Sequence, residues 1–216
     1  MELPPNCRCF YLVRHAESDR IGGACAMDPA LTPRGEAQLA ALVRHTAELA
    51  IDAIACSELS RARRTAEAIA AGHGVVPVID AGWNELHTVG AWRDRSHREV
   101  EELLAARLFE PDEHHPRGES LRALHRRALA AWARLVALPA RRVLVVSHNA
   151  LLVRLVQALL GLGEDAARTS AISYPNAAIS ELWLLDRDYD PTLPGPITLA
   201  MRIADAHHLP RDLVTR

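Results

Sequence analysis

Two residues that could bind and attack an anion lie side by side near the start of the chain. Arg14 and His15 directly follow the apolar run FYLV, which is typical of a buried strand. An arginine is always charged, and its charge discourages the neighbouring imidazole from taking up a proton near neutral pH. The pair therefore predicts an anion-binding guanidinium beside a neutral, nucleophilic histidine.

A second histidine stands in an equivalent position, because His148 follows the apolar run RVLVVS as His15 follows the first run. In open α/β sheets, ligands bind beyond the carboxyl ends of the strands, where the strand order reverses. We therefore expect the two histidines to face one ligand. The alternative is that each histidine ends a strand in a solvated loop, and the arginines near both of them make that alternative the weaker one.

Arg61 and Glu85 are two further candidates. Arg61 lies in the first turn of a predicted helix, just after the short apolar segment DAIACS. A helix N-terminus and a guanidinium both favour phosphate or carboxylate oxygens. Arg63 and Arg64 in the same helix are interpreted as part of a solvated face. Glu85 lies in a loop, where a carboxyl group in a cleft can act as a general acid; by itself it would be one exposed glutamate among many.

The elements that would position these residues alternate between strand and helix. Strands are predicted over residues 8–14, 52–57, 75–80, 142–147, 178–185 and 197–204, and helices over 33–50, 60–72, 99–108, 121–138 and 150–161. Thr32 is the predicted N-cap of the first helix, and Pro77 favours an edge position for the third strand because it cannot donate to a ladder. Apolar strands separated by helices favour an α/β fold of three layers, α/β/α, with a largely parallel central sheet.

Composition excludes several classes of protein. The net charge is -2 and only 4% of the residues are aromatic, which argues against a nucleic-acid partner. All 25 basic residues are arginine, so neither a Schiff-base lysine nor a Walker-type phosphate lysine exists in this chain. The four cysteines lack paired CxxC spacing, and the N-terminus lacks the pattern of a signal peptide. We expect reduced thiols, a cytoplasmic location and no membrane span.

Several segments together resemble the histidine phosphatase superfamily, the phosphoglycerate mutase-like proteins. The segments that resemble family motifs, in family order, are LVRHAES, LTPRGEAQ, CSELSRARRTAEAI, NELHTVGAW, RGES and VLVVSHNALL. They cover most of the chain as far as NAAISEL. The resemblance implies one histidine phosphatase domain over residues 1–216, with a small lid-like excursion around 86–118.

The resemblance also implies a role for each candidate residue. His15 would attack phosphorus and carry a transient phosphohistidine, and Glu85 would protonate the leaving alcohol and then accept a proton from the attacking water. The residues assigned to substrate binding are Arg14, Arg61, His148 and Asn149. No metal and no cofactor are implied. The expected partner is a small phosphorylated substrate; the oligomeric state is left undetermined by the sequence, which is compatible with a dimer.

Three departures from the family pattern concern the substrate and the turns around the site. Ala16 and Asn149 stand where the family commonly has glycine, and Ile21 stands where many members have asparagine. The short interval between Glu85 and Gly118 leaves room for a small lid at most, so hydrolysis of a phosphorylated metabolite is favoured over mutase activity. The alternatives are a phosphohistidine-protein phosphatase and a phosphate-binding protein without turnover.

Overall fold

One mixed sheet forms the centre of the computed structural model, which describes residues 2–19, 29–87, 118–168, 172–185 and 196–215. Its strands are β1 (Cys7–Arg14), β2 (Ala53–Cys56), β3 (Val78–Ile79), β4 (Arg142–Ser147), β5 (Ile179–Leu185) and β6 (Ile197–Asp205). The strand order is β3-β2-β4-β1-β5-β6. The pairings among β3, β2, β4 and β1 are parallel, whereas β5 is antiparallel to both β1 and β6. The predicted parallel core therefore carries an antiparallel extension at one edge.

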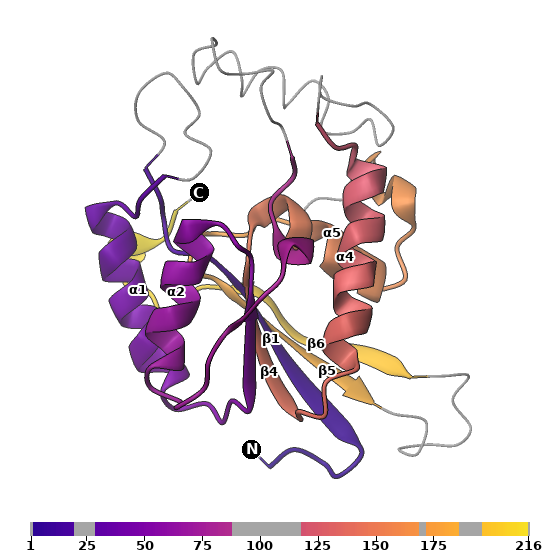
Figure 1. Cartoon of the computed structure of the whole chain (residues 1–216), viewed down its shortest axis with the longest axis horizontal. Helices are drawn as coiled ribbons and strands as arrows, with labels where there is room; N and C mark the ends of the chain where they lie inside the picture. The colour runs from indigo at the N-terminus through magenta and orange to yellow at the C-terminus, as the bar shows by residue number, and fades with distance from the viewer. Residues whose placement is uncertain (1, 20–28, 88–117, 169–171, 186–195, 216) are drawn as a thin grey trace.

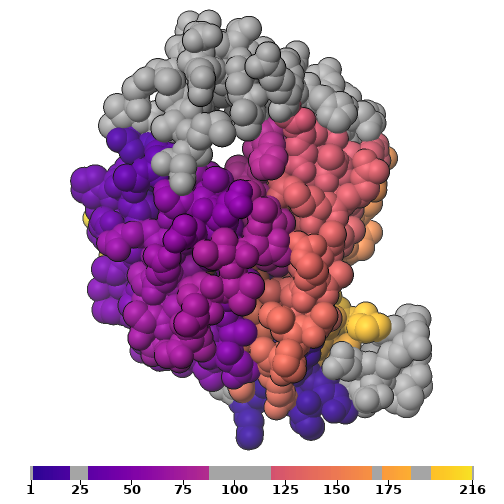
Figure 2. Space-filling view, in the orientation of Figure 1, coloured from indigo at the N-terminus to yellow at the C-terminus, as the bar shows by residue number. Residues whose placement is uncertain are grey.

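Helices cover both faces of this sheet, as the α/β/α prediction requires. They are α1 (Pro33–Thr46), α2 (Ser60–Ala70), α4 (Leu121–Val136) and α5 (Asn149–Leu159), with short 3₁₀ helices η1 (Ala81–Trp83), η2 (Glu164–Arg168) and η3 (Arg211–Leu213). Helices α1 and α2 lie on one side of the sheet and α4 and α5 on the other (Figure 1). In the space-filling view, the indigo-to-magenta part of the chain adjoins the salmon-to-orange part that contains α4 (Figure 2).

The side chains of β1 alternate between two apolar cores. Cys9, Tyr11 and Val13 pack in the core on the α1–α2 side, whereas Phe10 and Leu12 pack in the core on the α4–α5 side. Successive side chains of a strand point to opposite faces, so a strand covered on both sides must be apolar at every position. This requirement explains the unbroken apolar run before Arg14 and the similar run in β4.

The first helix begins as the sequence predicts. Thr32 accepts a hydrogen bond from the backbone N–H of Gly35 at 2.9 Å, and Pro33 occupies the first helical position. This contact satisfies one of the backbone donors that the start of a helix leaves open. The helix ends at Thr46, four residues before the predicted end at residue 50.

The third predicted strand is much shorter than expected. Only Val78 and Ile79 pair with β2, and they lie at the edge of the sheet, where Pro77 was expected to place them. Val76, Val78 and Ile79 are at least half exposed, so their apolar side chains do not mark a buried strand. The predicted helix over 99–108 and the greater part of the lid-like excursion, with Ile21, lie outside the described residues.

Two findings bear on the expectations from composition. Among the described residues, no helix combines the length and the apolar character that crossing a membrane demands. Cys7, Cys9 and Cys56 are buried, and no disulfide joins them within the described part of the chain.

Candidate active site

Three adjacent parallel strands end level with one another, and the candidate residues follow these ends. Arg14 is in register with Ser147, and Cys56 is in register with Val146. The backbone N–H of His15 donates to the carbonyl of Ser147 at 3.0 Å. The residues after β1, β2 and β4 are therefore neighbours at the carboxyl edge of the sheet, as the strand-end prediction requires.

The two predicted histidines meet at this edge. The ring centroids of His15 and His148 are 4.9 Å apart, and the planes of the two rings are inclined at 56°. His15 is 6% exposed and His148 is fully buried. The alternative of two histidines in separate solvated loops is wrong.

The contacts of His15 define which of its ring nitrogens carries the hydrogen. Nδ1 lies 2.7 Å from the carbonyl oxygen of Ala16, and Nε2 accepts a hydrogen bond from Nε of Arg61 at 3.3 Å. A carbonyl oxygen only accepts and a guanidinium N–H only donates, so the hydrogen of the neutral ring belongs on Nδ1. Nε2 then carries the lone pair and faces the guanidinium of Arg61.

Arg14 is held by the segment that leads into the antiparallel strand β5. Its guanidinium Nη1 donates to the carbonyl oxygen of Tyr174, and its backbone N–H donates to the carbonyl of Ala178 at 3.1 Å. The backbone N–H of Ala177 donates in turn to the carbonyl groups of Arg14 and His15 at 3.1 and 3.2 Å. Two guanidinium groups, those of Arg14 and Arg61, thus accompany the two imidazoles.

His148 is held by a hydroxyl group at the end of β2. Its Nε2 lies 2.9 Å from Oγ of Ser57, and that hydroxyl donates to Oδ1 of Asn84 at 2.7 Å. Burial, followed by the positive charges of its neighbours, holds the pKa of His148 well below its ordinary value. The imidazole is therefore neutral at neutral pH when the site is free.

Glu85 is directed at the N-terminus of α5. Its Oε1 accepts hydrogen bonds from the backbone N–H groups of Ala150 at 3.1 Å and of Leu86 at 2.9 Å. The first turn of a helix presents backbone N–H groups without intrahelical partners, and these groups bind acceptor oxygens such as Oε1 of Glu85. Asn149 is the first residue of α5. It lies between His148 and Ala150, whose N–H donates a hydrogen bond to Glu85.

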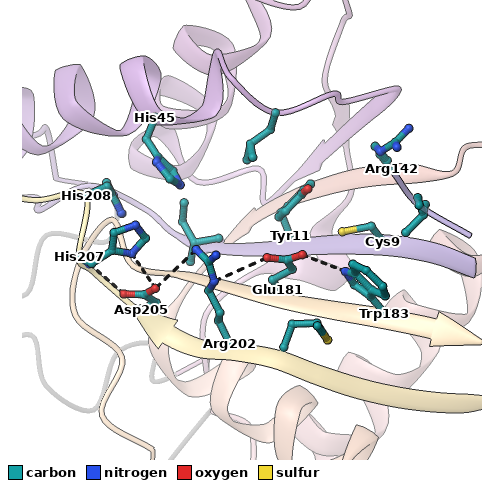
Figure 3. A pocket seen from close by; sticks show the side chains of 14 residues that line it. Cys9, Tyr11, His45, Arg142, Glu181, Trp183, Arg202, Asp205, His207 and His208 are labelled. Carbon is teal, nitrogen blue, oxygen red and sulfur yellow. Dashed lines mark hydrogen bonds and ion pairs between the residues drawn. The ribbon is translucent and has the colours of Figure 1, made fainter. Parts of the chain in front are cut away.

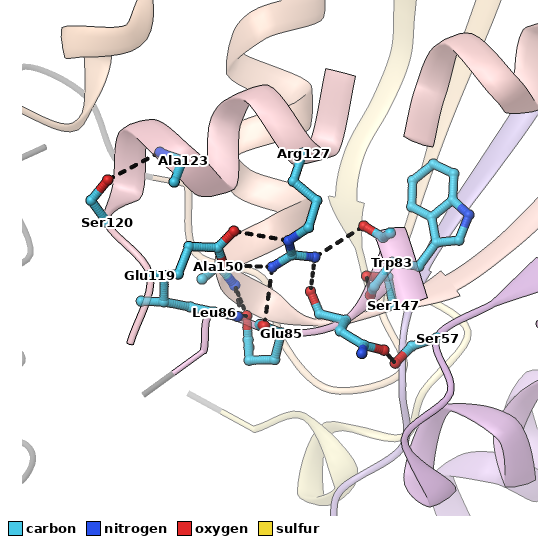
Figure 4. A network of polar contacts seen from close by, with 12 residues as sticks. Ser57, Trp83, Glu85, Leu86, Glu119, Ser120, Ala123, Arg127, Ser147 and Ala150 are labelled. Carbon is cyan, nitrogen blue, oxygen red and sulfur yellow. Dashed lines mark hydrogen bonds and ion pairs between the residues drawn. The ribbon is translucent and has the colours of Figure 1, made fainter. Parts of the chain in front are cut away.

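Arg127 of α4 ties down the loop that carries Glu85, residues 82–86, which we call the Glu85 loop. Its guanidinium donates to the carbonyl oxygens of Gly82, Asn84 and Glu85 at 3.0, 2.8 and 3.2 Å. The same group contacts both carboxylate oxygens of Glu119, at 2.9 and 2.7 Å (Figure 4). The planar guanidinium of Arg127 thus makes five contacts, which restrict the conformation of the Glu85 loop.

The segment after His15 is also held by hydrogen bonds, which its backbone N–H groups donate to side chains. The backbone N–H of Ala16 donates to Oγ1 of Thr65 at 3.2 Å, and that of Glu17 donates to Oε1 of Gln38 at 2.8 Å. Among the described residues, the non-glycine residues with a positive φ are Ala177 and Ala204, so neither Ala16 nor Asn149 adopts that conformation. Neither residue therefore needs the conformational freedom of the glycine that the family commonly has there, and Asn149 starts a helix.

Sequence reasoning missed Arg127 and the side chain of Asn84. Arg127 is one of many arginines on helices, and Asn84 carries no signal besides its place before Glu85. Ser57 and Glu119 belong to segments that resemble the family, but only the structure shows what their side chains contact. The sequence offered no other clue to these roles.

No group of three or more histidine, cysteine, aspartate or glutamate side chains that could hold a metal ion occurs among the described residues. The paired histidines His207 and His208 contact His45 instead, through ring centroid distances of 5.4 and 4.9 Å. His114 and His115, the other pair, lie outside the described residues.

A cavity of about 320 Å³ lies apart from the candidate active site. Its lining comes from β1, β5 and β6, the end of α1 and the turn that carries His207, and it includes Tyr11, Glu181, Trp183 and Arg202 (Figure 3). None of the candidate catalytic or substrate-binding residues lines it. The chemistry predicted at the strand ends and this cavity are therefore separate features.

The fold and the grouped side chains define an α/β protein with a cluster of arginine and histidine at its strand ends. The family model of the histidine phosphatase superfamily (branch 1) matches residues 10–191, and the chain belongs to this superfamily. The match spans all of the candidate residues.

Curated relatives agree with this assignment, and solved structures share the fold. A probable phosphoglycerate mutase, GpmB, of Klebsiella pneumoniae is 40% identical over 169 residues, covering 73% of this chain and 77% of the relative. The protein of the same name from Escherichia coli is 37% identical over 191 residues, covering 81% and 86%. Among solved structures, mycobacterial hydrolase 2 superposes with a TM-score of 0.78 at 24% identity, over 96% of this chain and 94% of that one. A mycobacterial glucosyl-3-phosphoglycerate phosphatase superposes with a TM-score of 0.74 at 23% identity, over 89% and 96%.

Proposed function

We propose that this protein is a phosphomonoesterase that hydrolyses a small phosphorylated metabolite through a phosphohistidine on His15. The observation that carries the proposal is the contact of Arg61 Nε with His15 Nε2 at 3.3 Å, beside the ring of His148. A nucleophilic nitrogen and a guanidinium at this distance can address the phosphorus and one oxygen of the same phosphoryl group.

The reaction has two steps. His15 Nε2 attacks phosphorus, the bond from phosphorus to the ester oxygen breaks, and the carboxylic acid of Glu85 gives its proton to the leaving oxygen. Water then attacks the phosphohistidine, Glu85 takes a proton from that water, and the nitrogen–phosphorus bond breaks to release phosphate. Arg14, Arg61 and His148 bind the phosphoryl oxygens, because phosphoryl transfer depends chiefly on positioning and on charge stabilisation.

The proposal is tested by hydrolysis of p-nitrophenyl phosphate. His15→Ala should abolish turnover, whereas His73→Ala, on the turn after α2, should leave it unchanged. Rapid quenching of the wild type with a phosphorus-labelled ester should leave label on the protein that is stable to alkali and lost in acid. Equal turnover by wild type and His15→Ala would disprove the proposal. A chelator should have no effect on turnover, and loss of activity would indicate a metallophosphatase.

Phosphoglycerate mutase activity is a second candidate, because relatives 37–40% identical to the chain bear that name. A mutase returns the phosphoryl group to a different hydroxyl of the same substrate, whereas a hydrolase gives it to water. Incubation with 3-phosphoglycerate separates the two. Release of phosphate would support the hydrolase, and appearance of 2-phosphoglycerate without release would support the mutase.

A further inference from the structure

The ring of His148 has one nitrogen fully engaged and one that is not. Nε2 lies 2.9 Å from Ser57 Oγ, while Nδ1 is buried and has no hydrogen-bond partner among the described residues. His148 is the N-cap residue of α5, but its side chain makes no capping hydrogen bond. The N–H of Ala150 in the first turn goes to Glu85 instead. Nδ1 is therefore the ring atom left for a ligand beside His15.

The hydrogen bonds around Ser57 can run in only one direction. The backbone N–H of Glu58 donates to Asn84 Oδ1 at 3.2 Å, which identifies that atom as the carbonyl oxygen, and Nδ2 donates to the Glu58 carboxylate at 2.8 Å. Because Oδ1 only accepts, the Ser57 hydroxyl must donate its hydrogen to it. The N–H of Leu59 donates to Ser57 at 3.1 Å. Towards His148 the hydroxyl can only accept.

His148 must therefore carry a hydrogen on Nε2. In the neutral ring, Nδ1 is then a bare lone pair, which an oxyanion would avoid. Contact with a phosphoryl oxygen requires a hydrogen between the two atoms, either on Nδ1 or on the ligand. Asn84 is 3% exposed and Ser57 is fully buried, so water does not compete easily for these bonds.

The charges around His148 oppose its protonation until an anion arrives. The groups that act on it are His15, which follows β1, Arg61 of α2, Arg14 of β1 and Arg127 of α4. The carboxyl group of Glu85 lies at the first turn of α5, and that of Glu58 lies beyond Asn84. Burial and the positive neighbours hold the pKa of His148 well below its ordinary value in the free protein. A bound dianion among the same groups would reverse that balance.

We infer that Ser57 and Asn84 are positioning residues that fix the tautomer of His148, so that phosphate enters the site together with one proton shared with His148 Nδ1. The inference rests on the proposed function, because it assumes that a phosphoryl group binds beside His15. In one route the phosphate dianion binds and the complex takes up a proton from the solvent. In the other route the phosphate monoanion binds and brings the proton with it. Both routes give the same complex, which holds one proton more than the free protein and the free dianion.

Calorimetric titration with inorganic phosphate measures this proton directly. The titration is run at about pH 8.5, where phosphate is mainly a dianion, in several buffers that differ in their enthalpy of ionisation. The slope of the binding enthalpy against the buffer enthalpy gives the number of protons taken up. Wild type should take up about one, and its dissociation constant should rise about tenfold for each pH unit over this range.

Variants identify the group responsible. His148→Gln should bind phosphate more weakly with almost no proton uptake, whereas Glu85→Gln should keep the uptake. Asn84→Ala releases the Ser57 hydrogen, which can then point to Nε2 and allow the tautomer with hydrogen on Nδ1. This variant should bind the dianion with less proton uptake and a weaker pH dependence. Ser57→Ala should behave in the same way, and Ser57→Thr, which keeps the hydroxyl group, should restore the uptake.

The outcomes separate this inference from the proposed function. Phosphate binding by wild type without proton uptake, or uptake that persists in His148→Gln, would overturn the inference while the phosphatase proposal stood. Proton uptake that is equal in wild type and Asn84→Ala would show that the hydrogen bonds from Asn84 through Ser57 do not fix the tautomer of His148. That result would also overturn the inference. No binding of phosphate by folded wild type would count against the proposed function as well. Circular dichroism of each variant establishes that it is folded.

Discussion

Arg127 Nε and Nη2 contact the two carboxylate oxygens of Glu119 at 2.9 and 2.7 Å, and the remaining donors of the same guanidinium hold the Glu85 loop. The contacts with the carbonyl oxygens join α4 to a loop that is distant in sequence, whereas the ion pair is local to the start of α4. Its two side chains are only 21% and 12% exposed. Their contact is therefore a fixed part of the site rather than a surface ion pair.

Replacing Arg127 should lower activity without removing any group that touches the substrate. Arg127→Ala should reduce kcat by about 10- to 100-fold, because a small displacement of a catalytic group has effects of this size. It should also destabilise the protein by about 1–3 kcal/mol, because carbonyl groups lose their partner. Steady-state kinetics and denaturant unfolding measure the two effects. The matched control is Arg126→Ala, at an exposed position of the same helix.

Arg127→Lys distinguishes position from charge. A lysine keeps the positive charge but cannot reproduce the forked contacts. If it restored full activity, the charge alone would be sufficient and the loop geometry would not matter.

Glu85→Gln should separate the two chemical steps, because glutamine can neither give nor take the proton. With p-nitrophenyl phosphate, whose leaving group needs little protonation, the variant should release a burst of about one nitrophenol per protein and then turn over slowly. With an alkyl phosphate there should be no burst, and kcat should fall by about 10²- to 10⁴-fold. The control is Glu48→Gln, at an exposed position after α1. If kcat fell equally on both substrates and no burst appeared, Glu85 would not be the general acid.

The strand-end residues were predictable because their signals are local. An apolar run that is covered on both faces must end where the chain leaves the sheet, and in parallel strands these ends share one edge. The proximity of His15 and His148 could therefore be predicted from the sequence alone. The same reasoning fails for the segment 75–80, where Val76 is 88% exposed. Pro77 indicated the edge position of this strand, but the apolar residues around it indicated neither its short length nor its exposure.

Arg127 and Asn84 were not predictable because their partners are scattered. Arg127 binds residues on both sides of the interval 86–118, and Asn84 joins the ends of β2 and β4 through Ser57. Neither pattern has a spacing that a helix or a strand would repeat. Such contacts arise only when tertiary packing brings separate segments together.

Acidification should destabilise the fold through His208. Burial, followed by its neighbours His45 and His207, lowers the pKa of His208 to about 4. Its unfolded value is near 6.5, so the unfolded chain binds more protons between these two pH values. The contribution of His208 is complete above about pH 6.5 and is lost as the pH falls towards about 4, by about 1–2 kcal/mol once solvent screening of this partly exposed ring is allowed for. Urea unfolding across this range should show a smaller loss in His208→Asn than in wild type and in the control His73→Asn.

Gly35 should resist substitution because α1 packs against the segment that follows His15. A Cβ atom at this position would lie 2.0 Å from the backbone oxygen of Glu17, and a backbone atom cannot swing aside as the end of a side chain can. Gly35→Ala should therefore push Glu17 away from Thr32, whose N–H donates to the same oxygen at 3.0 Å. We expect a loss of about 1–3 kcal/mol of stability and a fall in kcat, because Glu17 is joined to His15 through Ala16 alone. Gly163→Ala is the control, because a Cβ atom there meets nothing within 4 Å. If both variants unfolded at the same denaturant concentration and turned over equally fast, the close packing of α1 would have no part in positioning the nucleophile.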